Sequence, residues 1–228
     1  MAPHLHTRVY IIRHGETQEN RTGVIQGQLD TELNALGEEQ AREVARALRE
    51  QGVRFDRAYS SDLRRAVKTA ETILGDAEVV LVKEEALRER YMGTLQGTTS
   101  VDGRSRATKV AADTTIETTA AFAARTAGWW TRAILQRTLA LPPREDGEPY
   151  NVLVASHGGA IGILLRGLLG SRRAVLAEGV NVGMVRNVSM TVLEVPTDGP
   201  AVVVKYGDVA HLSSEAGLVR GNVDEVAN

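Results

Sequence analysis

Arg13 and His14 are the first residues of this chain whose types and position could do chemistry. They follow residues 9–12, an apolar and largely β-branched run that predicts a buried strand, and Gly15 comes directly after them. In open α/β folds, ligands bind in the crevice beyond the carboxyl ends of the strands. A histidine at that place is a candidate nucleophile or base, and an adjacent arginine is suited to holding a phosphate.

A second histidine repeats this arrangement. Residues 152–156 predict another buried strand, which ends at His157, and Gly158 and Gly159 then open a predicted helix. The N-terminus of a helix offers unpaired amide groups and the positive end of the helix dipole, so it suits an anion. Two strand-end histidines can therefore meet over one phosphate.

Two arginines follow a third predicted strand. Arg64 and Arg65 lie near the start of a helix expected from Asp62, after a strand at 55–59. Neighbouring residues on a helix differ by about 100° in direction, so only one of the two can point into the crevice, and the spacing does not say which. Singly, such residues are more often caps, solvated faces or tight turns. Their coincidence at three strand ends favours a phosphate site.

The elements that must position these side chains alternate along the chain. Apolar runs predict strands at 8–12, 55–59, 79–82, 152–156, 188–195 and 201–206. Helical periodicity and capping residues predict helices at 34–51, 62–74, 117–139 and 159–169. Polar loops are expected at 15–30 and 141–149, and a turn at 197–200 joins the last two strands. The alternation predicts a three-layer α/β/α sandwich with a mostly parallel central sheet and helices on both faces.

Composition excludes several classes of protein. The 228 residues, 43% hydrophobic and 25% charged, are typical of a soluble globular protein, and the net charge of −2 gives no drive towards nucleic acid or anionic membrane. The absence of cysteine excludes disulfides and thiolate metal sites. Residues 2–7 do not resemble a signal peptide and no apolar run is long enough to span a bilayer, so a cytoplasmic location is expected. We expect His4 and His6 to lie in a frayed terminus that makes a poor metal site, and the tail after Leu212 to be loose.

Several further motifs occur in a fixed order. They are residues 13–17 with Asn20, Gln26 with Gly27, 33–41, 60–66 with Thr69 and Ala70, 87–97, 156–159, and 187–189. In that order they resemble the histidine phosphatase superfamily, the group of the cofactor-dependent phosphoglycerate mutases and fructose-2,6-bisphosphatases. Arg-His-Gly alone is weakly specific, but the ordered set is highly specific. The resemblance implies a phosphoglycerate mutase-like fold.

The resemblance also implies catalytic roles. His14 would be the nucleophile that becomes phosphohistidine. Arg13, Arg65 and His157 would hold the transferred phosphoryl group. Glu89 would donate a proton to the leaving oxygen.

The resemblance further selects Arg65 over its neighbour Arg64. The positions that it implies for the phosphate or substrate pocket are Asn20, Gln26, Gly27 and Gly158. No metal or other cofactor is required, because side chains supply the positive charge.

These roles are chemically coherent. Fixed cations stabilise the charge that spreads over the phosphoryl oxygens in the transition state. A neutral imidazole of His14 can attack phosphorus in line, and Glu89 must carry a proton when the reaction begins. From spacing alone, Glu89 is better explained by a surface ion pair with Arg88 or Arg90. Glu16 is a second carboxylate near the nucleophile and a reserve proton donor.

The motifs favour the phosphatase branch over the mutases. Mutases carry Glu-Arg-His-Tyr-Gly where residues 89–93 read Glu-Arg-Tyr-Met-Gly. They also carry a basic pair in the middle segment, which in this chain is residues 98–150. In this chain the middle-segment cations Arg104, Arg106 and Lys109 are scattered. The expected substrate is a sugar phosphate or another small phosphomonoester. A phosphoglycerate mutase is the alternative, and a non-catalytic phospho-ligand binding protein is a third.

The middle segment is expected to choose the substrate. We expect residues 1–228 to form a single domain in which 98–150 is a shortened cap. Phosphatase relatives carry a Gly-Glu-Ser motif before the long helix, and the nearest match is Ile116-Glu117-Thr118, which lacks the glycine.

Overall fold

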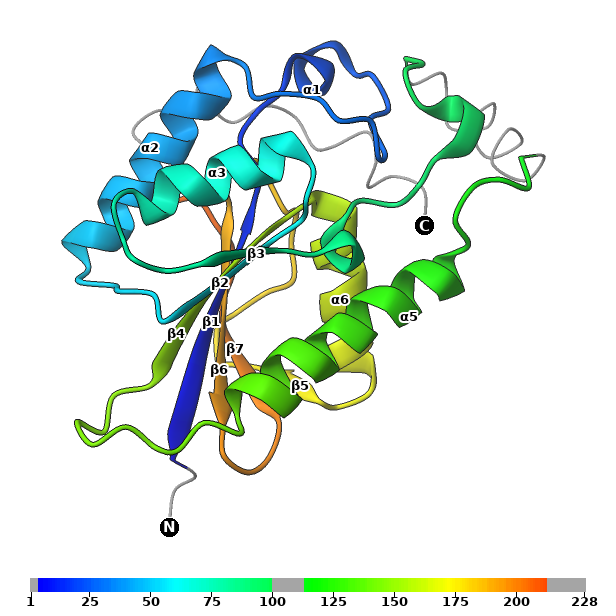
Figure 1. The fold of residues 1–228 in the computed structure, drawn as a ribbon. Helices are drawn as coiled ribbons and strands as arrows, with labels where there is room; N and C mark the ends of the chain where they lie inside the picture. The colour runs from blue at the N-terminus through cyan, green and yellow to red at the C-terminus, as the bar shows by residue number, and fades with distance from the viewer. Residues whose placement is uncertain (1–3, 100–112, 213–228) are drawn as a thin grey trace.

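A seven-stranded sheet organises the fold (Figure 1). The computed structural model describes residues 4–99 and 113–212. The strands are β1 (Leu5–Arg13), β2 (Arg57–Ser60), β3 (Leu81–Lys83), β4 (Tyr150–Ser156), β5 (Ala174–Leu176), β6 (Met190–Pro196) and β7 (Ala201–Asp208). Their order across the sheet is β3-β2-β4-β1-β6-β7-β5. Only β6 runs antiparallel to its neighbours, β1 and β7, so the mostly parallel sheet is confirmed.

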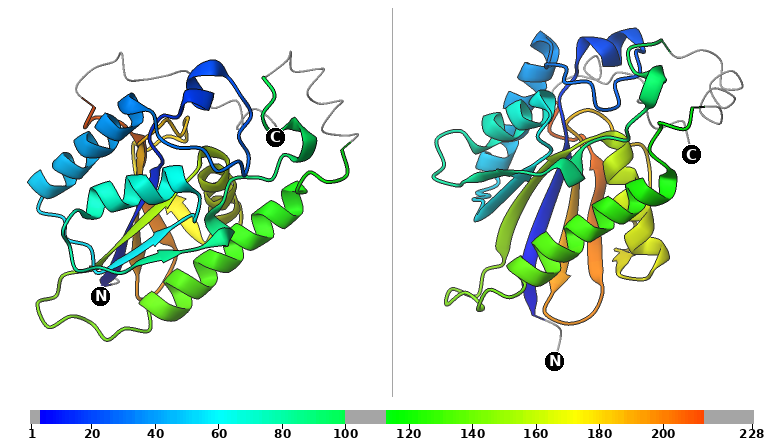
Figure 2. Two further views of the ribbon diagram at one scale, coloured as in Figure 1. Left: turned by 45° about the horizontal axis from the view of Figure 1, so that its top comes forward. Right: turned by 45° about the vertical axis from the view of Figure 1, so that its right-hand side comes forward.

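Successive residues of β1 face opposite layers of the molecule. Val9 and Ile11 pack into one hydrophobic cluster, while Tyr10 and Ile12 pack into another. The helices that cover the two faces are α2 (Ala35–Glu50) with α3 (Arg64–Leu74), and α5 (Thr119–Trp130) with α6 (Gly158–Gly170). Figures 1 and 2 show these two pairs on opposite sides of the sheet. An unbroken apolar strand is what a sheet covered on both faces requires, and the three-layer sandwich is confirmed.

The first helix of the α2–α3 layer begins where its capping residue predicts. The side-chain oxygen of Asn34 accepts a hydrogen bond from the amide of Gly37 at 2.8 Å. The expected apolar face is buried and consists of Ala41, Val44, Ala45 and Leu48. At this end α2 lies against the loop after β1: a Cβ on Gly15 would lie 2.4 Å from the carbonyl oxygen of Gly37. Both positions therefore need glycine.

Several boundaries differ from the expected ones. The loop expected at 15–30 contains a short helix, α1 (Gln18–Thr22), which begins with a capping box formed by Thr17 and Asn20. The long helix expected at 117–139 is α5 followed by a π-helical segment, η3 (Thr131–Thr138). Strand β5 was not predicted, because Ala174–Leu176 has one β-branched residue, whereas the run 79–82 that predicted β3 has three. The strand expected from 188 begins at Met190, since Val188 has a φ of 48° and cannot extend it.

The expectation of a frayed start is wrong for His6. This side chain is 5% exposed within β1, and its Nδ1 lies 2.8 Å from the Thr7 hydroxyl. Its Nε2 lies 3.0 Å from the carbonyl oxygen of Leu141. Backbone hydrogen bonding also includes His4, whose carbonyl accepts from the amide of Thr197. The ring of His6 is thus part of the packed structure.

Some expectations lie outside the described residues. They concern Arg104, Arg106 and Lys109, the first part of the 98–150 segment, and the tail from 213 onwards. Among the described helices, none combines the length and the apolar character that crossing a bilayer requires.

Candidate active site

The carboxyl ends of three neighbouring strands bring the candidate residues together. The amide of His14, just after β1, donates to the carbonyl of Ser156 at the end of β4, over 2.9 Å. The amide of Ser61, just after β2, donates to the carbonyl of Ala155, also over 2.9 Å. The imidazole rings of His14 and His157 lie 5.1 Å apart between centroids at an angle of 59°. The two strand-end histidines meet, as the sequence predicts.

The surroundings of His14 fix which of its nitrogens can react. Its ring is 1% exposed, and Nδ1 lies 2.7 Å from the carbonyl oxygen of Gly15. Because a carbonyl oxygen can only accept, Nδ1 carries the hydrogen and Nε2 carries the lone pair. Burial, and then the charges of Arg65 and Arg13, hold the pKa of His14 well below its usual value. The ring is therefore a neutral base at neutral pH, as a nucleophile must be.

Two buried arginines flank this imidazole. Arg13 and Arg65 are each 1% exposed. Arg13 donates from Nη1 to the carbonyl of Val185 over 2.8 Å. Arg65 donates from Nη1 to the carbonyl of Leu29 over 2.6 Å and from Nη2 to that of Gly27 over 2.9 Å. Backbone carbonyls thus fix both guanidinium groups, and α3 places Arg65 rather than Arg64 beside the histidines.

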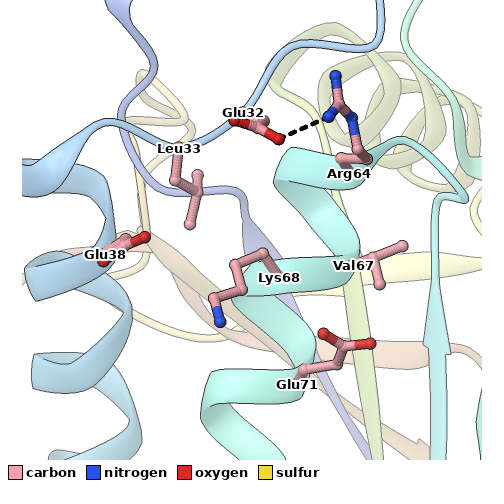
Figure 3. Close-up of a pocket in the computed structure, with 7 residues that line it drawn as sticks. All are labelled: Glu32, Leu33, Glu38, Arg64, Val67, Lys68 and Glu71. Atoms are coloured by element: carbon pink, nitrogen blue, oxygen red, sulfur yellow. Dashed lines mark hydrogen bonds and ion pairs between the residues drawn. The ribbon is translucent and has the colours of Figure 1, made fainter.

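Arg64 points away from the histidines. It pairs with Asp30 and Glu32 at the surface. Figure 3 shows it at the rim of a separate groove of about 350 Å³, which is lined by Glu32, Leu33, Glu38, Arg64, Val67, Lys68 and Glu71. Three carboxylates in that lining make the groove a poor site for a phosphate, and none of the candidate catalytic residues lines it.

His157 is held by a hydroxyl group. Its ring is fully buried, and Nε2 lies 2.8 Å from Oγ of Ser61. Within the described part of the chain, Nδ1 has no hydrogen-bond partner. Burial lowers the pKa of His157 well below its usual value, and the charges of Arg65 and Arg13 add to this effect. Ser61 belongs to a motif that the resemblance matched, yet no role was assigned to it from the sequence.

Glu89 is buried, so its interpretation as a surface ion pair is wrong. The side chain is 1% exposed, and Arg88 pairs with Asp62 instead. Oε1 of Glu89 accepts from the amide of Arg90 and Oε2 from the amide of Gly159, each over 2.8 Å. A Cβ on Gly159 would lie 2.3 Å from Oε1, so only glycine leaves room for this carboxyl group.

Glu16 has a different environment from Glu89. It is fully buried, and its Oε1 accepts from Asn34 Nδ2 over 2.7 Å and from Arg21 Nε over 2.9 Å. These contacts join the loop after His14 to α1 and to the start of α2. Glu16 therefore acts as an anchor, and its contacts do not favour a role as reserve proton donor.

The amide side chains expected in the pocket are oriented by their neighbours. Oδ1 of Asn20 accepts from the amide of Thr17 and from Nδ2 of Asn187, each over 3.2 Å. Oε1 of the buried Gln26 accepts from the hydroxyls of Thr17 and Thr31, over 3.1 and 2.6 Å. The amide nitrogen of each side chain is therefore the atom that could donate to a ligand.

The two glycines expected in the pocket are next to candidate catalytic residues. Gly27 presents its carbonyl to Arg65. Gly158 is buried at the first position of α6, directly after His157. That position supplies one of the unpaired amides with which a helix N-terminus can hold an anion.

A turn that received no role from the sequence supports the nucleophile. Nδ2 of Asn187 donates to the carbonyl of His14 over 3.0 Å, and the amide of Val188 donates to the carbonyl of Arg13 over 3.1 Å. Val188 is fully buried with a φ of 48°, a conformation that is unusual for a β-branched residue. Such strain persists only where the surroundings impose it. The turn thus fixes the backbone of the Arg13–His14 pair.

Comparison with known proteins finds relatives that match most of the chain. Residues 9–208 match the profile of the histidine phosphatase superfamily, branch 1. The chain is 32% identical to a broad-specificity phosphatase of Saccharomyces cerevisiae, over 90% of this chain and 87% of that protein. It is 30% identical to a metal-independent phosphoserine phosphatase of Arabidopsis thaliana, over 94% and 87% respectively. A crystal structure of phosphoglycerate mutase from Bacillus anthracis superimposes with a TM-score of 0.72 at 25% identity, covering 99% of each chain.

Proposed function

The chain belongs to branch 1 of the histidine phosphatase superfamily, and from that membership we propose how its residues hydrolyse small phosphomonoesters. The observation that carries the proposal is the buried imidazole of His14, whose Nδ1 is held by the carbonyl of Gly15 and whose ring lies 5.1 Å from that of His157. Burial and the charges of Arg65 and Arg13 lower its pKa, so the ring is neutral. Nε2 attacks phosphorus as the bond from phosphorus to the leaving oxygen breaks. Arg13, Arg65 and His157 hold the equatorial oxygens and stabilise the charge that develops there.

Glu89 is the proposed proton carrier. It gives its proton to the leaving oxygen, so that the alcohol departs neutral. The carboxylate then takes a proton from the water molecule that attacks the phosphohistidine. Inorganic phosphate leaves, and His14 and the protonated Glu89 are restored. The net reaction is phosphomonoester and water to alcohol and phosphate.

Asn20, Gln26, Gly27 and Gly158 are the proposed phosphate-binding positions. The side-chain oxygens of Asn20 and Gln26 already accept hydrogen bonds from neighbouring residues. This supports the proposal that their amide nitrogens, together with the backbone at the start of α6, donate to phosphoryl oxygens. The two arginines supply the positive charge of the site, so we propose that neither metal nor cofactor takes part.

We further propose that the chain forms a single domain. Within the expected cap segment 98–150, α5 covers a face of the sheet and Leu141 contacts His6 near the start of β1, so these parts do not lie over the end of the sheet that carries His14.

A phosphoglycerate mutase is the second candidate, because the solved mutase shares the fold over almost the whole chain. Where mutases carry a tyrosine, this chain has Met92, which is 1% exposed in a small apolar cluster with Ile25, Leu95 and Ile116. An apolar side chain that packs inwards brings no hydroxyl group to a substrate. This position favours hydrolysis over isomerisation.

The deciding experiment supplies 3-phosphoglycerate with 2,3-bisphosphoglycerate and measures both 2-phosphoglycerate and released phosphate. Phosphoserine and sugar phosphates are measured in parallel. We expect phosphate release to dominate. Isomerisation at a higher rate than hydrolysis of every monoester would establish the mutase instead.

The covalent intermediate is tested by rapid quench. During turnover of p-nitrophenyl phosphate, the wild-type protein is expected to carry phosphate that is labile in acid and stable in base. His14→Ala should carry none and should release no phosphate. Full turnover by His14→Ala would remove the nucleophile assignment.

A further inference from the structure

Arg125 lies outside every motif that the sequence singles out, yet it contacts the segment that ends in Glu89. We propose that Arg125 is a positioning residue that sets the location of this proton donor. The inference rests on the role of Glu89 proposed above. It assigns to α5 a part in the chemistry in addition to covering one face of the sheet.

Arg125 binds backbone carbonyls of the segment from Ala86 to Glu89. Its Nη1 donates to the carbonyls of Ala86 and Arg88, over 2.9 and 2.8 Å, and its Nη2 donates to the carbonyl of Glu89 over 2.8 Å. The carbonyl between them, that of Leu87, accepts from Oγ of Ser156 over 2.7 Å. Side chains from outside the segment thus satisfy four successive carbonyls, and one guanidinium group serves three of them.

The guanidinium group is itself held in place. Its Nε lies 2.6 Å from Oε1 of Glu117 and its Nη2 lies 2.9 Å from Oε2, which is a two-point ion pair. The centre of the guanidinium group lies 4.6 Å from the centroid of the Phe122 ring. Both Arg125 and Glu117 are largely buried, at 21% and 14% side-chain exposure. A planar group with five donors fits this set of acceptors, and a lysine ammonium does not.

Glu117 extends the same contacts to the residues after the proton donor. Its carbonyl accepts from Nε of Arg90 over 2.7 Å, and its Oε2 lies 3.2 Å from the amide of Tyr91. The ion pair of Arg125 with Glu117 therefore holds the segment from Ala86 to Tyr91 on both sides of Glu89. Gln28 adds one contact, because its Nε2 donates to the carbonyl of Glu89 over 3.1 Å.

The position of this segment decides the alignment of the carboxyl group. One amide that holds Glu89 belongs to the segment, at Arg90, whereas the other belongs to α6, at Gly159. A shift of the segment relative to α6 cannot preserve both bonds. Without Arg125, the carboxyl group loses its fixed distance to the leaving oxygen, while His14, Arg13 and Arg65 keep their own supports.

This separation predicts a dependence on the leaving group. Phosphoserine loses a poor, alkoxide-like leaving group that needs a proton, whereas p-nitrophenolate leaves without one. The test compares Arg125→Lys with Glu89→Gln on both substrates. Arg137→Lys, an exposed arginine on η3 that contacts neither the segment nor Glu117, is the matched control. Lysine retains the positive charge near His157, so Arg125→Lys changes the geometry and not the charge.

The expected result is a selective loss. We expect Arg125→Lys to lower kcat/KM for phosphoserine about tenfold or more, and kcat/KM for p-nitrophenyl phosphate by less than about threefold. The comparison uses kcat/KM because it reports only the transfer to His14, before Glu89 acts as a base on water. Removing general acid catalysis entirely costs about 10²–10⁴-fold, so Glu89→Gln should show the same selectivity with a larger loss. Arg137→Lys should change neither rate.

The contrary results are distinguishable. Equal losses on both substrates in Arg125→Lys, with selective loss in Glu89→Gln, overturn the inference and leave the proposed mechanism standing. Equal losses in Glu89→Gln remove the proton-donor role and the inference with it. If Arg125→Lys does not fold by circular dichroism, Glu117→Gln replaces it, because this variant keeps Arg125 but weakens its ion pair. Glu117→Gln should give a smaller selective loss, and the absence of selectivity would again overturn the inference.

Discussion

The two buried imidazoles tie stability to pH. The fold lowers the pKa of both His14 and His157 from the usual 6.5, mainly through burial. The unfolded chain therefore binds protons first as the pH falls below about 6.5. Above that pH both states leave the two rings neutral, and the free energy of unfolding is at its full value. As the pH falls from 6.5 towards the lowered pKa values of the folded state, protonation favours the unfolded chain and the free energy of unfolding decreases. Each ring can account for at most about 1.4 kcal/mol per pH unit of this loss.

Urea unfolding between pH 7.5 and 5 measures this effect. The free energy of unfolding should fall more steeply with decreasing pH in the wild type than in the double variant His14→Asn/His157→Asn, which lacks both rings. Equal slopes would show that the two rings are protonated alike in the folded and unfolded states.

Replacing Gly159 by alanine tests whether the absence of a side chain at this position makes room for the carboxyl group of Glu89. Alanine usually stabilises a helix relative to glycine by about 0.5–1 kcal/mol. In Gly159→Ala, however, the new Cβ would lie 2.3 Å from Oε1 of Glu89 and must displace it. We expect phosphoserine hydrolysis to fall about tenfold or more. Gly167→Ala on the same helix is the control, since its Cβ meets nothing within 4 Å. Activity in Gly159→Ala equal to that of the control would mean that the carboxyl group has other room.

For single residues, the sequence patterns predicted which side chains form the site better than they predicted the hydrogen-bond partners of those side chains. The strand-end positions of His14 and His157 follow from local hydrophobicity, which the sequence carries directly. Spacing favoured a surface ion pair for Glu89, because its partners at Arg90 and Gly159 are backbone amides, which leave no mark in the sequence. Arg125 was missed for the same reason, since three of its acceptors are carbonyl groups.

The start of α2 is an element whose cap also serves the site. Asn34 accepts from the amide of Gly37 and donates to the buried Glu16. Asn34→Ala should therefore cost the cap, about 1 kcal/mol, and in addition remove a donor from a buried carboxylate, about 1–3 kcal/mol. Thr118→Ala removes only a cap, that of α5. Urea unfolding should show the larger loss for Asn34→Ala, and equal losses would limit Asn34 to capping.

Long periodic elements were predicted more accurately than short ones, although the short strands β2 and β3 were expected at 55–59 and 79–82. The cap and apolar face of α2 placed it to within a residue. The five residues of α1 are too short to show periodicity and β5 has one β-branched residue, so tertiary contacts decide their conformation. The change from α5 to the π-helical η3 has no counterpart in the apolar pattern.

On the scale of the whole molecule, strand order is what concentrates charge in a nearly neutral protein. Alternation of strands and helices predicts the layers, but the central position of β1 between β4 and β6 depends on pairing between distant residues. That order brings Arg13, from β1, beside Arg65, from the helix after β2. The chain as a whole has a net charge of −2. A phosphate dianion should therefore be attracted to this one site rather than to the general surface.

Binding of phosphate to the folded state should consequently raise its melting temperature. At a concentration about 100 times the Kd, phosphate adds about 2.7 kcal/mol, which corresponds to about 5–10 °C for a chain of this size. Arg65→Gln should lose most of this shift, whereas Arg64→Gln, which changes only an exposed arginine, should keep it. Sodium chloride at equal ionic strength should not reproduce the shift, and a chelator should not abolish it if side chains alone supply the charge. An equal shift in both variants would place the bound phosphate elsewhere on the protein.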